Sequence, residues 1–301
     1  MSNKFFITGA NGQLGRDLIH ELTSRGIECT ASDLQENFTG AEKCGYIQLD
    51  ITDYDSVDKA IQASKPSRVI HCAAWTAVDP AEDEANRAKV YAVNVTGTEN
   101  IAKACAKYDA VMTYISTDYI FDGTGTAPRT PDDESFSPLN YYGKTKLEGE
   151  LAVKKYLQKF FIVRIAWVFG ANGNNFVRTM LKIAKTHDTI RVVNDQIGTP
   201  TYTPDLARLL ADINMTEKFG IYHATNEGGY ISWYDFACEI FRQSGVNVNV
   251  IPVSTSEYGL SKAKRPYNSR LDKSKLLSSG FKPLPDWKDA LRRYLSENGT
   301  N

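Results

Sequence analysis

The sequence has no excess of charge of either sign, and this absence removes two classes of partner. Lysine and arginine number 35 against 36 aspartate and glutamate, so the formal net charge is −1. No strong positive field is therefore available to attract nucleic acid or an anionic membrane surface. We expect neither as a partner, and an anionic ligand must be held by local groups.

Cysteines are few, and long apolar runs are missing. The five cysteines are odd in number, widely spaced and never in a CxxC pair, which argues against a disulfide framework and a zinc site. No stretch reaches the roughly 18 apolar residues of a membrane helix. Met1 leads directly into a short apolar run rather than a secretory leader, so we expect a cytoplasmic protein without a membrane span.

What the first half does contain is a regular alternation of short apolar runs with amphipathic stretches. The predicted strands are residues 4–8, 27–32, 46–49, 68–72, 111–116 and 161–165, and the predicted helices are 12–25, 54–63, 81–106 and 142–157. Alternation of this kind favours a parallel sheet with helices on both faces, because parallel neighbours need crossover connections. We predict an α/β fold with a Rossmann-type doubly wound parallel sheet.

The pattern becomes less regular after about Gly170. Helical patterns at 176–185, 203–214, 232–244 and 285–295 are separated by turns rich in glycine, proline and asparagine. We expect residues 1–170 to form the dinucleotide-binding domain, with residues 171–301 mostly a smaller substrate-binding lobe from which some segments return to the main sheet. No linker-like tract separates the two, so a cleft between them is the expected ligand site.

A glycine loop, GANGQLG at 9–15, follows the first predicted strand and opens the first helix. Glycines in this position allow a tight turn and a close backbone approach to a pyrophosphate, which the helix N-terminus then faces. A plain tight turn is the alternative reading. The candidate cofactor-binding residues here are Gly9, Asn11, Gly12, Gln13, Leu14 and Gly15.

Further cofactor contacts are expected at the carboxyl ends of the next strands. Asp33 ends the second strand, where a carboxylate accepts hydrogen bonds from an adenosine ribose and repels a 2′-phosphate. It therefore favours NADH over NADPH, although a solvated strand-end aspartate is the alternative. Asp50 and Ile51 after the third strand, and Ala73 and Ala74 after the fourth, are expected walls of the adenosine site.

Three side chains form a candidate reacting centre. Thr117 ends the fifth predicted strand, and Tyr142 and Lys146 lie four residues apart on the following helix, hence on one face. Ketone reduction needs a proton for the developing alkoxide, and a tyrosine can supply it if a nearby ammonium lowers its usual pKa of about 10. Thr117 would hold the substrate oxygen by a hydrogen bond. Tyr142 and Lys146 are also expected to contact the cofactor.

With these motifs the chain resembles the extended short-chain dehydrogenase/reductase superfamily and, more narrowly, the dTDP-4-dehydrorhamnose reductase family. The resemblance runs nearly from end to end. Beyond the glycine loop and the Tyr/Lys pair, it rests on AAWTAVD at 73–79, STDYIFDG at 116–123, RIAWVFG at 164–170, GNNF at 173–176, DQIGTPT at 195–201, SWY at 232–234, RP at 265–266 and PDW at 285–287.

The resemblance implies NAD(P)H-dependent reduction of the C4 ketone of dTDP-4-dehydro-6-deoxy-L-mannose to dTDP-L-rhamnose, for polysaccharide biosynthesis. Thr117, Tyr142 and Lys146 are then the catalytic residues. It also implies sugar contacts from Thr76, Val78, Asp118, Tyr119, Trp167 and Asn175. A core aromatic and a helix cap are the alternatives for Trp167 and Asn175. The four histidines are scattered, and we predict no metal.

Other functions share parts of this pattern. A dehydratase or epimerase of the superfamily would carry the same loop and Tyr/Lys pair, but dehydratases place an Asp-Glu pair after the strand-five hydroxyl, and here Asp118 precedes Tyr119. A non-catalytic nucleotide-binding regulatory subunit, related to that of methionine adenosyltransferase, and a reductase of another nucleotide-linked 4-keto sugar also stay open. The expected assembly is a monomer or a homodimer.

Overall fold

A parallel seven-stranded sheet forms the centre of the protein. The computed structural model describes residues 4–298. The strands lie in the order β11-β6-β5-β4-β1-β2-β3 and every neighbouring pair is parallel. Their bounds are β1 (Phe5–Thr8), β2 (Cys29–Asp33), β3 (Gly45–Gln48), β4 (Arg68–His71), β5 (Val111–Thr117), β6 (Phe160–Ile165) and β11 (Gly220–His223).

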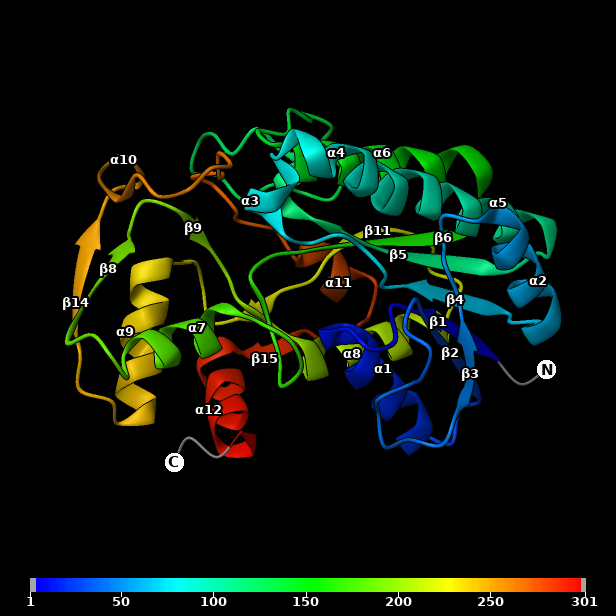
Figure 1. Ribbon diagram of the computed structural model, residues 1–301, viewed down its shortest axis with the longest axis horizontal. Coiled ribbons are helices and arrows are strands. Elements are labelled where there is room, and N and C mark those ends of the chain that lie inside the picture. Colours follow the sequence, from blue (N-terminus) through cyan, green and yellow to red (C-terminus); the bar gives the residue numbers. More distant parts are fainter. Residues whose placement is uncertain (1–3, 299–301) are drawn as a thin grey trace.

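Helices cover both faces of this sheet (Figure 1). On one face lie α1 (Gln13–Ser24) and α8 (Thr203–Asn214); on the other lie α2 (Tyr54–Ser64), α5 (Thr98–Lys107) and α6 (Tyr141–Tyr156). Apolar residues of the sheet pack against both helix layers, so one hydrophobic cluster lies on each side of the sheet. The doubly wound α/β fold predicted from the sequence is confirmed.

The strand order reverses between β1 and β4. From β1 the chain proceeds through β2 to β3 on one side, and from β4 through β5 to β6 on the other. Crossover connections therefore leave in opposite directions at this point, and a crevice forms at the carboxyl ends of the two strands. The glycine loop after β1 and Cys72 after β4 lie at this edge.

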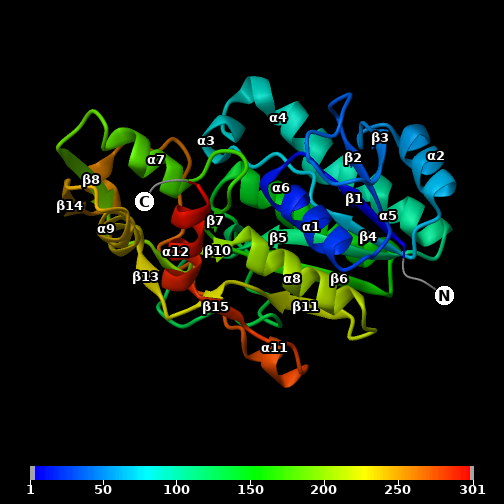
Figure 2. The ribbon, with the colours of Figure 1, turned by 90° about the horizontal axis from the view of Figure 1, so that it is seen from below.

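A second lobe lies beside the carboxyl edge of the sheet (Figures 1 and 2). Its helices are α7 (Phe176–Ile183), α9 (Trp233–Ser244), α10 (Thr255–Tyr258) and α12 (Trp287–Glu297). Four two-stranded pairings contribute to this part: β7 (Val168–Phe169) with β10 (Thr201–Tyr202), β8 (Thr189–Val193) with β14 (Asn249–Val253), β9 (Ile197–Gly198) with β13 (Ile231–Ser232), and β12 (Asn226–Glu227) with β15 (Leu284–Asp286). Its aromatic core joins Phe169 of β7 and Tyr202 of β10 to Phe236 of α9 and to Trp287 and Tyr294 of α12. The short helix α11 (Ser274–Ser278) packs instead on β11 of the main sheet, where its Leu276 joins the cluster beneath α1 and α8.

The helix predicted at residues 81–106 begins at Glu84, after a turn at residues 82–83, and changes to π-helical hydrogen bonding in its middle. The structure has α3 (Val78–Ala81), α4 (Glu84–Tyr91), a π-helical segment η1 (Ala92–Gly97) and then α5. Within η1 the Asn94 amide accepts a hydrogen bond from the Trp75 backbone N–H at 2.8 Å and donates one to the Thr145 hydroxyl at 3.0 Å. These contacts with distant segments were invisible in the helical periodicity, and π segments of this kind recur at functional sites.

Candidate functional site

The glycine loop packs so closely against neighbouring backbone that side chains at Gly9 and Gly15 would not fit. Gly9 has a φ of +68°, and a Cβ there would lie 2.6 Å from the backbone nitrogen of Ala73. A Cβ on Gly15 would lie 2.2 Å from the Gly9 carbonyl oxygen. The loop between β1 and α1 therefore presents bare backbone at the N-terminus of a helix, which is the arrangement that accommodates a pyrophosphate.

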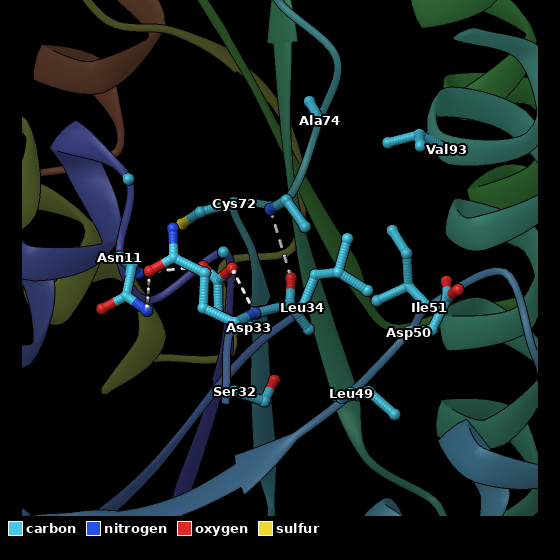
Figure 3. Close-up of a pocket in the computed structure, with 15 residues that line it drawn as sticks. Asn11, Ser32, Asp33, Leu34, Leu49, Asp50, Ile51, Cys72, Ala74 and Val93 are labelled. Atoms are coloured by element: carbon cyan, nitrogen blue, oxygen red, sulfur yellow. Dashed lines mark hydrogen bonds between the residues drawn. The ribbon is translucent and has the colours of Figure 1, made fainter. Parts of the chain in front are cut away.

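An adenosine-sized cavity of about 340 Å³ opens beside this loop (Figure 3). Asp33 lies in it, and its Oδ2 accepts a hydrogen bond from the Asn11 backbone N–H at 2.9 Å. Most of the predicted cofactor residues line it, namely Gly9, Asn11, Gly12, Asp33, Asp50, Ile51, Ala73 and Ala74. Leu34, Gln35, Leu49 and Val93 also line it and were not predicted, because no sequence signal marks such apolar or exposed positions as ligand walls.

A second cavity, of about 420 Å³, contains the predicted reacting groups. It is lined by Thr117, Tyr142 and Lys146, by the loop residues Gln13, Leu14 and Gly15, and by the predicted sugar residues Thr76, Val78, Asp118, Tyr119 and Trp167. Gly9, Gly12, Cys72 and Ala74 line both cavities. The two cavities therefore adjoin along the carboxyl edge of the sheet, as a dinucleotide with a substrate beside it would require.

Helix α6 positions the Tyr/Lys pair. The Asn140 side chain caps this helix by accepting the Gly143 N–H at 2.8 Å. One turn in, the Lys146 ammonium donates to the Ile115 carbonyl at 2.7 Å and lies 4.1 Å from the centroid of the Tyr114 ring. Burial lowers the pKa of Lys146 to about 7, and the charge of Glu150 counteracts this. The lysine is thus held over β5 by a carbonyl and an aromatic face.

The pKa of Tyr142 differs from what the sequence suggested. Burial raises the pKa of the phenol above 10, while a hydrogen bond with the Thr117 hydroxyl opposes the rise. The sequence predicts that Lys146 lowers this pKa, and that prediction is wrong for the protein without cofactor, because desolvation of the phenolate outweighs the effects that favour it. The Tyr142 ring also packs edge-on against Tyr119, with centroids 5.8 Å apart.

Thr117 is joined to a buried carboxyl group. Its hydroxyl donates to Asp118 Oδ1 at 3.1 Å and accepts the Tyr119 backbone N–H at 3.3 Å. Burial raises the pKa of Asp118 to about 6, against hydrogen bonds from the Ser269 and Thr117 hydroxyls. Ser116, the residue before Thr117, has a buried hydroxyl without a hydrogen-bond partner among the described residues, and it lines the second cavity.

The structure separates Asn175 from the other predicted sugar residues. Asn175 is not among the residues that line the second cavity. It caps α7 by accepting the Arg178 N–H at 3.0 Å, and its amide donates to the Gly170 carbonyl at 2.8 Å. Trp167, by contrast, lines the cavity with a φ of 52° and stacks on Trp233 at a centroid separation of 3.8 Å. The helix-cap alternative therefore describes Asn175 better.

A third cavity, of about 340 Å³, continues beyond Trp233 into the second lobe. Arg265 lies in it and pairs with Asp79 through two hydrogen bonds of 2.7 and 3.1 Å. The other lining side chains include Phe176, Met180, Arg191, Gln196 and Tyr258. None of these residues is among the predicted site residues: Phe176, Gln196, Trp233 and Arg265 lie within motifs of the resemblance, and no motif includes Met180, Arg191 or Tyr258.

Three further features concern metal ligands, membrane-spanning helices and the state of the cysteines. Within residues 4–298, no three His, Cys, Asp or Glu side chains gather as metal ligands would. None of the helices in that part of the chain is long and apolar enough to cross a membrane. All five cysteines are free.

The residues present fit a nicotinamide dinucleotide. The glycine cradle that a Cβ would fill, the carboxylate at the end of β2 and the adjoining second cavity supply the three parts that such a ligand needs. The fold and this edge of the sheet are those of a short-chain dehydrogenase/reductase.

Comparison with known proteins narrows this class. The RmlD substrate binding domain model matches residues 3–299. A dTDP-4-dehydrorhamnose reductase of Aggregatibacter actinomycetemcomitans is 41% identical over 96% of this chain and 97% of its own. The chain therefore belongs to the RmlD family, that of the dTDP-4-dehydrorhamnose reductases, and is an oxidoreductase.

Solved structures agree. A dTDP-4-dehydrorhamnose reductase of Clostridium acetobutylicum superposes with a TM-score of 0.89 at 43% identity, over 98% of this chain and 99% of the other. One from Bacillus anthracis, in complex with NADP, also has a TM-score of 0.89, at 39% identity over 99% and 100%. The family resemblance stated from the sequence is confirmed.

Proposed function

We propose that this protein uses NADH or NADPH to reduce the C4 ketone of dTDP-4-dehydro-6-deoxy-L-mannose, giving dTDP-L-rhamnose. The observation that carries the proposal is the convergence of Thr117, Tyr142 and Lys146 on one cavity that adjoins the glycine-loop cavity. Family membership supports the same reaction, since curated relatives are dTDP-4-dehydrorhamnose reductases.

The three side chains divide the work on the carbonyl group. When bound, a reduced nicotinamide would supply the hydride for the new C–H bond. Thr117 turns its single hydroxyl proton from Asp118, which accepts it in the protein alone, and donates it to the substrate oxygen. Tyr142 transfers its phenolic proton to that oxygen as negative charge develops. Because burial raises the pKa of Tyr142, the phenol is fully protonated at neutral pH, which is the state a proton donor needs. The Lys146 ammonium stabilises the phenolate that is left.

The cofactor would be held along the first cavity. Gly9, Asn11, Gly12, Gln13, Leu14 and Gly15 would approach the pyrophosphate; Asp50, Ile51, Ala73 and Ala74 would contact the adenosine; Tyr142 and Lys146 would contact the nicotinamide half. Asp33 would bind the ribose hydroxyls and favour NADH, because a 2′-phosphate would meet its negative charge. The relative with NADP bound shows that family members can take the phosphorylated cofactor.

The sugar would occupy the second cavity, and the nucleotide would occupy the third. Thr76, Val78, Asp118, Tyr119 and Trp167 would surround the sugar, while the third cavity offers aromatic and cationic groups for a thymidine diphosphate. In this arrangement residues 1–170 hold the dinucleotide and also supply these sugar contacts, while residues 171–301 supply most of the third cavity, where the nucleotide would bind. The wall between the two cavities is Trp233, which lines both.

The test is NADH and NADPH oxidation, followed at the nicotinamide absorbance band, with enzymatically generated dTDP-4-dehydro-6-deoxy-L-mannose. We expect turnover and formation of dTDP-L-rhamnose. The same assay with other dTDP- and UDP-linked 4-keto sugars defines the substrate. Nucleotide binding without turnover on any of them would reject the reductase and leave the regulatory-subunit alternative.

A further inference from the structure

A buried ion pair lies behind the reacting centre. Arg164 on β6 and Glu150 on α6 both have fully buried side chains, with relative exposures of 0%. They form two parallel hydrogen bonds of 2.9 Å, from Nε to Oε1 and from Nη2 to Oε2. Arg164 also donates to the Pro131 carbonyl at 3.1 Å, and its Nη1 lies 3.4 Å from Nε2 of His223. Charges buried this deeply are rarely needed for stability, since apolar pairs can replace them.

The carboxylate of this pair belongs to the same helical row as the predicted catalytic residues. Tyr142, Lys146 and Glu150 are spaced four apart on α6, so all three lie toward one side of that helix. Tyr114 of β5 packs beneath the row. Its hydroxyl donates to the Lys146 carbonyl at 3.2 Å and its ring lies under the Lys146 ammonium.

Among the groups around Lys146, Glu150 is the one whose negative charge stabilises the ammonium at pH 7. His71 and Cys72 approach it from the end of β4: burial lowers the pKa of His71 to about 3 and raises that of Cys72 to about 12, so both are neutral at pH 7. Tyr114 and Tyr142 are neutral phenols whose pKa values burial raises. The Arg164 guanidinium is hydrogen-bonded to the Glu150 carboxylate.

We propose that Glu150, held in place by Arg164, is a positioning residue that keeps Lys146 in its ammonium form and aimed at the reacting centre. The inference rests on the proposed role of Lys146 in ketone reduction. Burial alone favours the uncharged amine. A carboxylate one turn away offsets that effect, and the arginine holds this carboxylate in place through two hydrogen bonds.

The charge of Lys146 determines the direction in which removing Glu150 shifts the pH profile. The active form of Lys146 is the cation, so activity falls as pH rises through its pKa. Glu150 raises that pKa; removing its charge must lower it and move the alkaline limb of the kcat profile to lower pH. A shift of about one pH unit corresponds to about a tenfold loss of kcat at pH values above both limbs.

Two variants separate charge from folding. Glu150→Gln removes the carboxylate but leaves the Arg164 cation buried and unpaired, which can unfold the chain. The double variant Glu150→Gln with Arg164→Met removes both charges. We expect the alkaline limb of the kcat profile to lie at the highest pH in wild type, at a lower pH in the double variant and at the lowest pH in the single variant. The single variant is lowest because its unpaired arginine further disfavours the Lys146 ammonium.

Asp205→Asn is the matched control. Asp205 is 3% exposed, accepts from Arg293 at 2.7 Å and from the Asn226 amide at 2.8 Å, and lies on α8, away from the row. This variant also loses a buried carboxylate partnered by an arginine. It should unfold at a lower temperature and keep the wild-type alkaline limb.

The second readout does not depend on turnover. In protein carrying ¹³C-labelled lysine, the Cε resonance of Lys146, assigned with Lys146→Met, is titrated in each variant by NMR. A lower titration midpoint in the Glu150 variants than in wild type and Asp205→Asn supports the proposal. Equal midpoints in wild type and the folded double variant overturn it, even if kcat is reduced. Failure of wild type to reduce the sugar would instead reject the proposed function, and the NMR titration would still decide whether Glu150 holds the charge of Lys146.

Discussion

The two adjoining cavities at the carboxyl edge of the sheet are built in different ways. The adenosine-side cavity is lined largely by backbone and by small or apolar residues from the ends of β1 to β4, and Asp33 is bonded to the loop beside it. The reaction cavity is lined by hydroxyl, phenol, ammonium, carboxyl and indole groups from segments between Gly9 and Trp233. Shape therefore governs the first cavity and individual functional groups govern the second.

This difference predicts different responses to substitution. In the first cavity an added atom should do damage and a lost side chain should matter little. In the second cavity, the loss of a single functional atom should be enough to impair the reaction. The tests below run from the largest expected effect to the smallest.

Tyr142→Phe should reduce kcat by roughly 10²–10⁴-fold, the usual contribution of a positioned proton donor. Steady-state kinetics with the dTDP-linked ketone measures this, and NADH binding by fluorescence should stay close to wild type. A variant that keeps most of its kcat would show that the proton comes from another group.

Gly9→Ala should weaken NADH binding by up to about 100-fold. The new Cβ would lie 2.6 Å from the Ala73 backbone nitrogen, and overpacking of this kind costs about 1–3 kcal/mol. Isothermal titration calorimetry gives the Kd. Gly26→Ala is the control: its φ is +69° and nothing lies within 4 Å of the added atom, so it should lower stability by about 1–2 kcal/mol and leave the Kd unchanged.

Asp118→Asn should stabilise the fold above pH 6. The unfolded carboxyl ionises near pH 3.8 and the folded one near 6, so the native state holds the extra proton between these values and wild-type stability falls as pH rises through them. The amide has no such penalty, and the gain should be about 1–3 kcal/mol at pH 7.5. Urea unfolding at pH 7.5 and 4.5 checks this: the gain should be clearly smaller at pH 4.5, and an equal gain at the two pH values would contradict it.

Trp233→Ala should raise the KM for the nucleotide sugar by about 10-fold, because it removes the stack with Trp167, and aromatic pairs contribute about 0.5–1.5 kcal/mol beyond their buried area. The Kd for NADH serves as the internal control and should not change. Loss of NADH binding as well would mean that the indole supports both cavities.

Asp33→Ala should raise the ratio of NADPH to NADH efficiency by roughly 3-fold, a small factor because solvent screens a half-exposed charge. The ratio of kcat/KM values for the two cofactors measures it. An unchanged ratio would show that Asp33 does not select the cofactor.

Sequence reasoning found the parts of the site that short stretches of the chain specify. The glycine loop and the Tyr/Lys pair each span only a few positions, and the structure brings Thr117, Tyr142 and Lys146 to a single cavity. Sequence reasoning missed features that depend on distant partners. The π-helical segment inside the helix predicted at 81–106 contains Asn94, whose amide bonds the far residues Trp75 and Thr145. Asn175, by contrast, caps α7 by accepting the N–H of the nearby Arg178, which is the local alternative that the sequence offered.

The sequence by itself determined the parallel sheet, the dinucleotide loop and the family, because periodicity, glycine spacing and motifs are local properties of the chain. Only the tertiary structure decided how the second lobe closes the site and what surrounds each ionisable group. Burial, which raises the pKa of Tyr142 and lowers that of Lys146, is a property of atoms from β4, β5 and α6 packed together. Desolvation depends on that packing and not on neighbours in the chain, so no motif could reveal it.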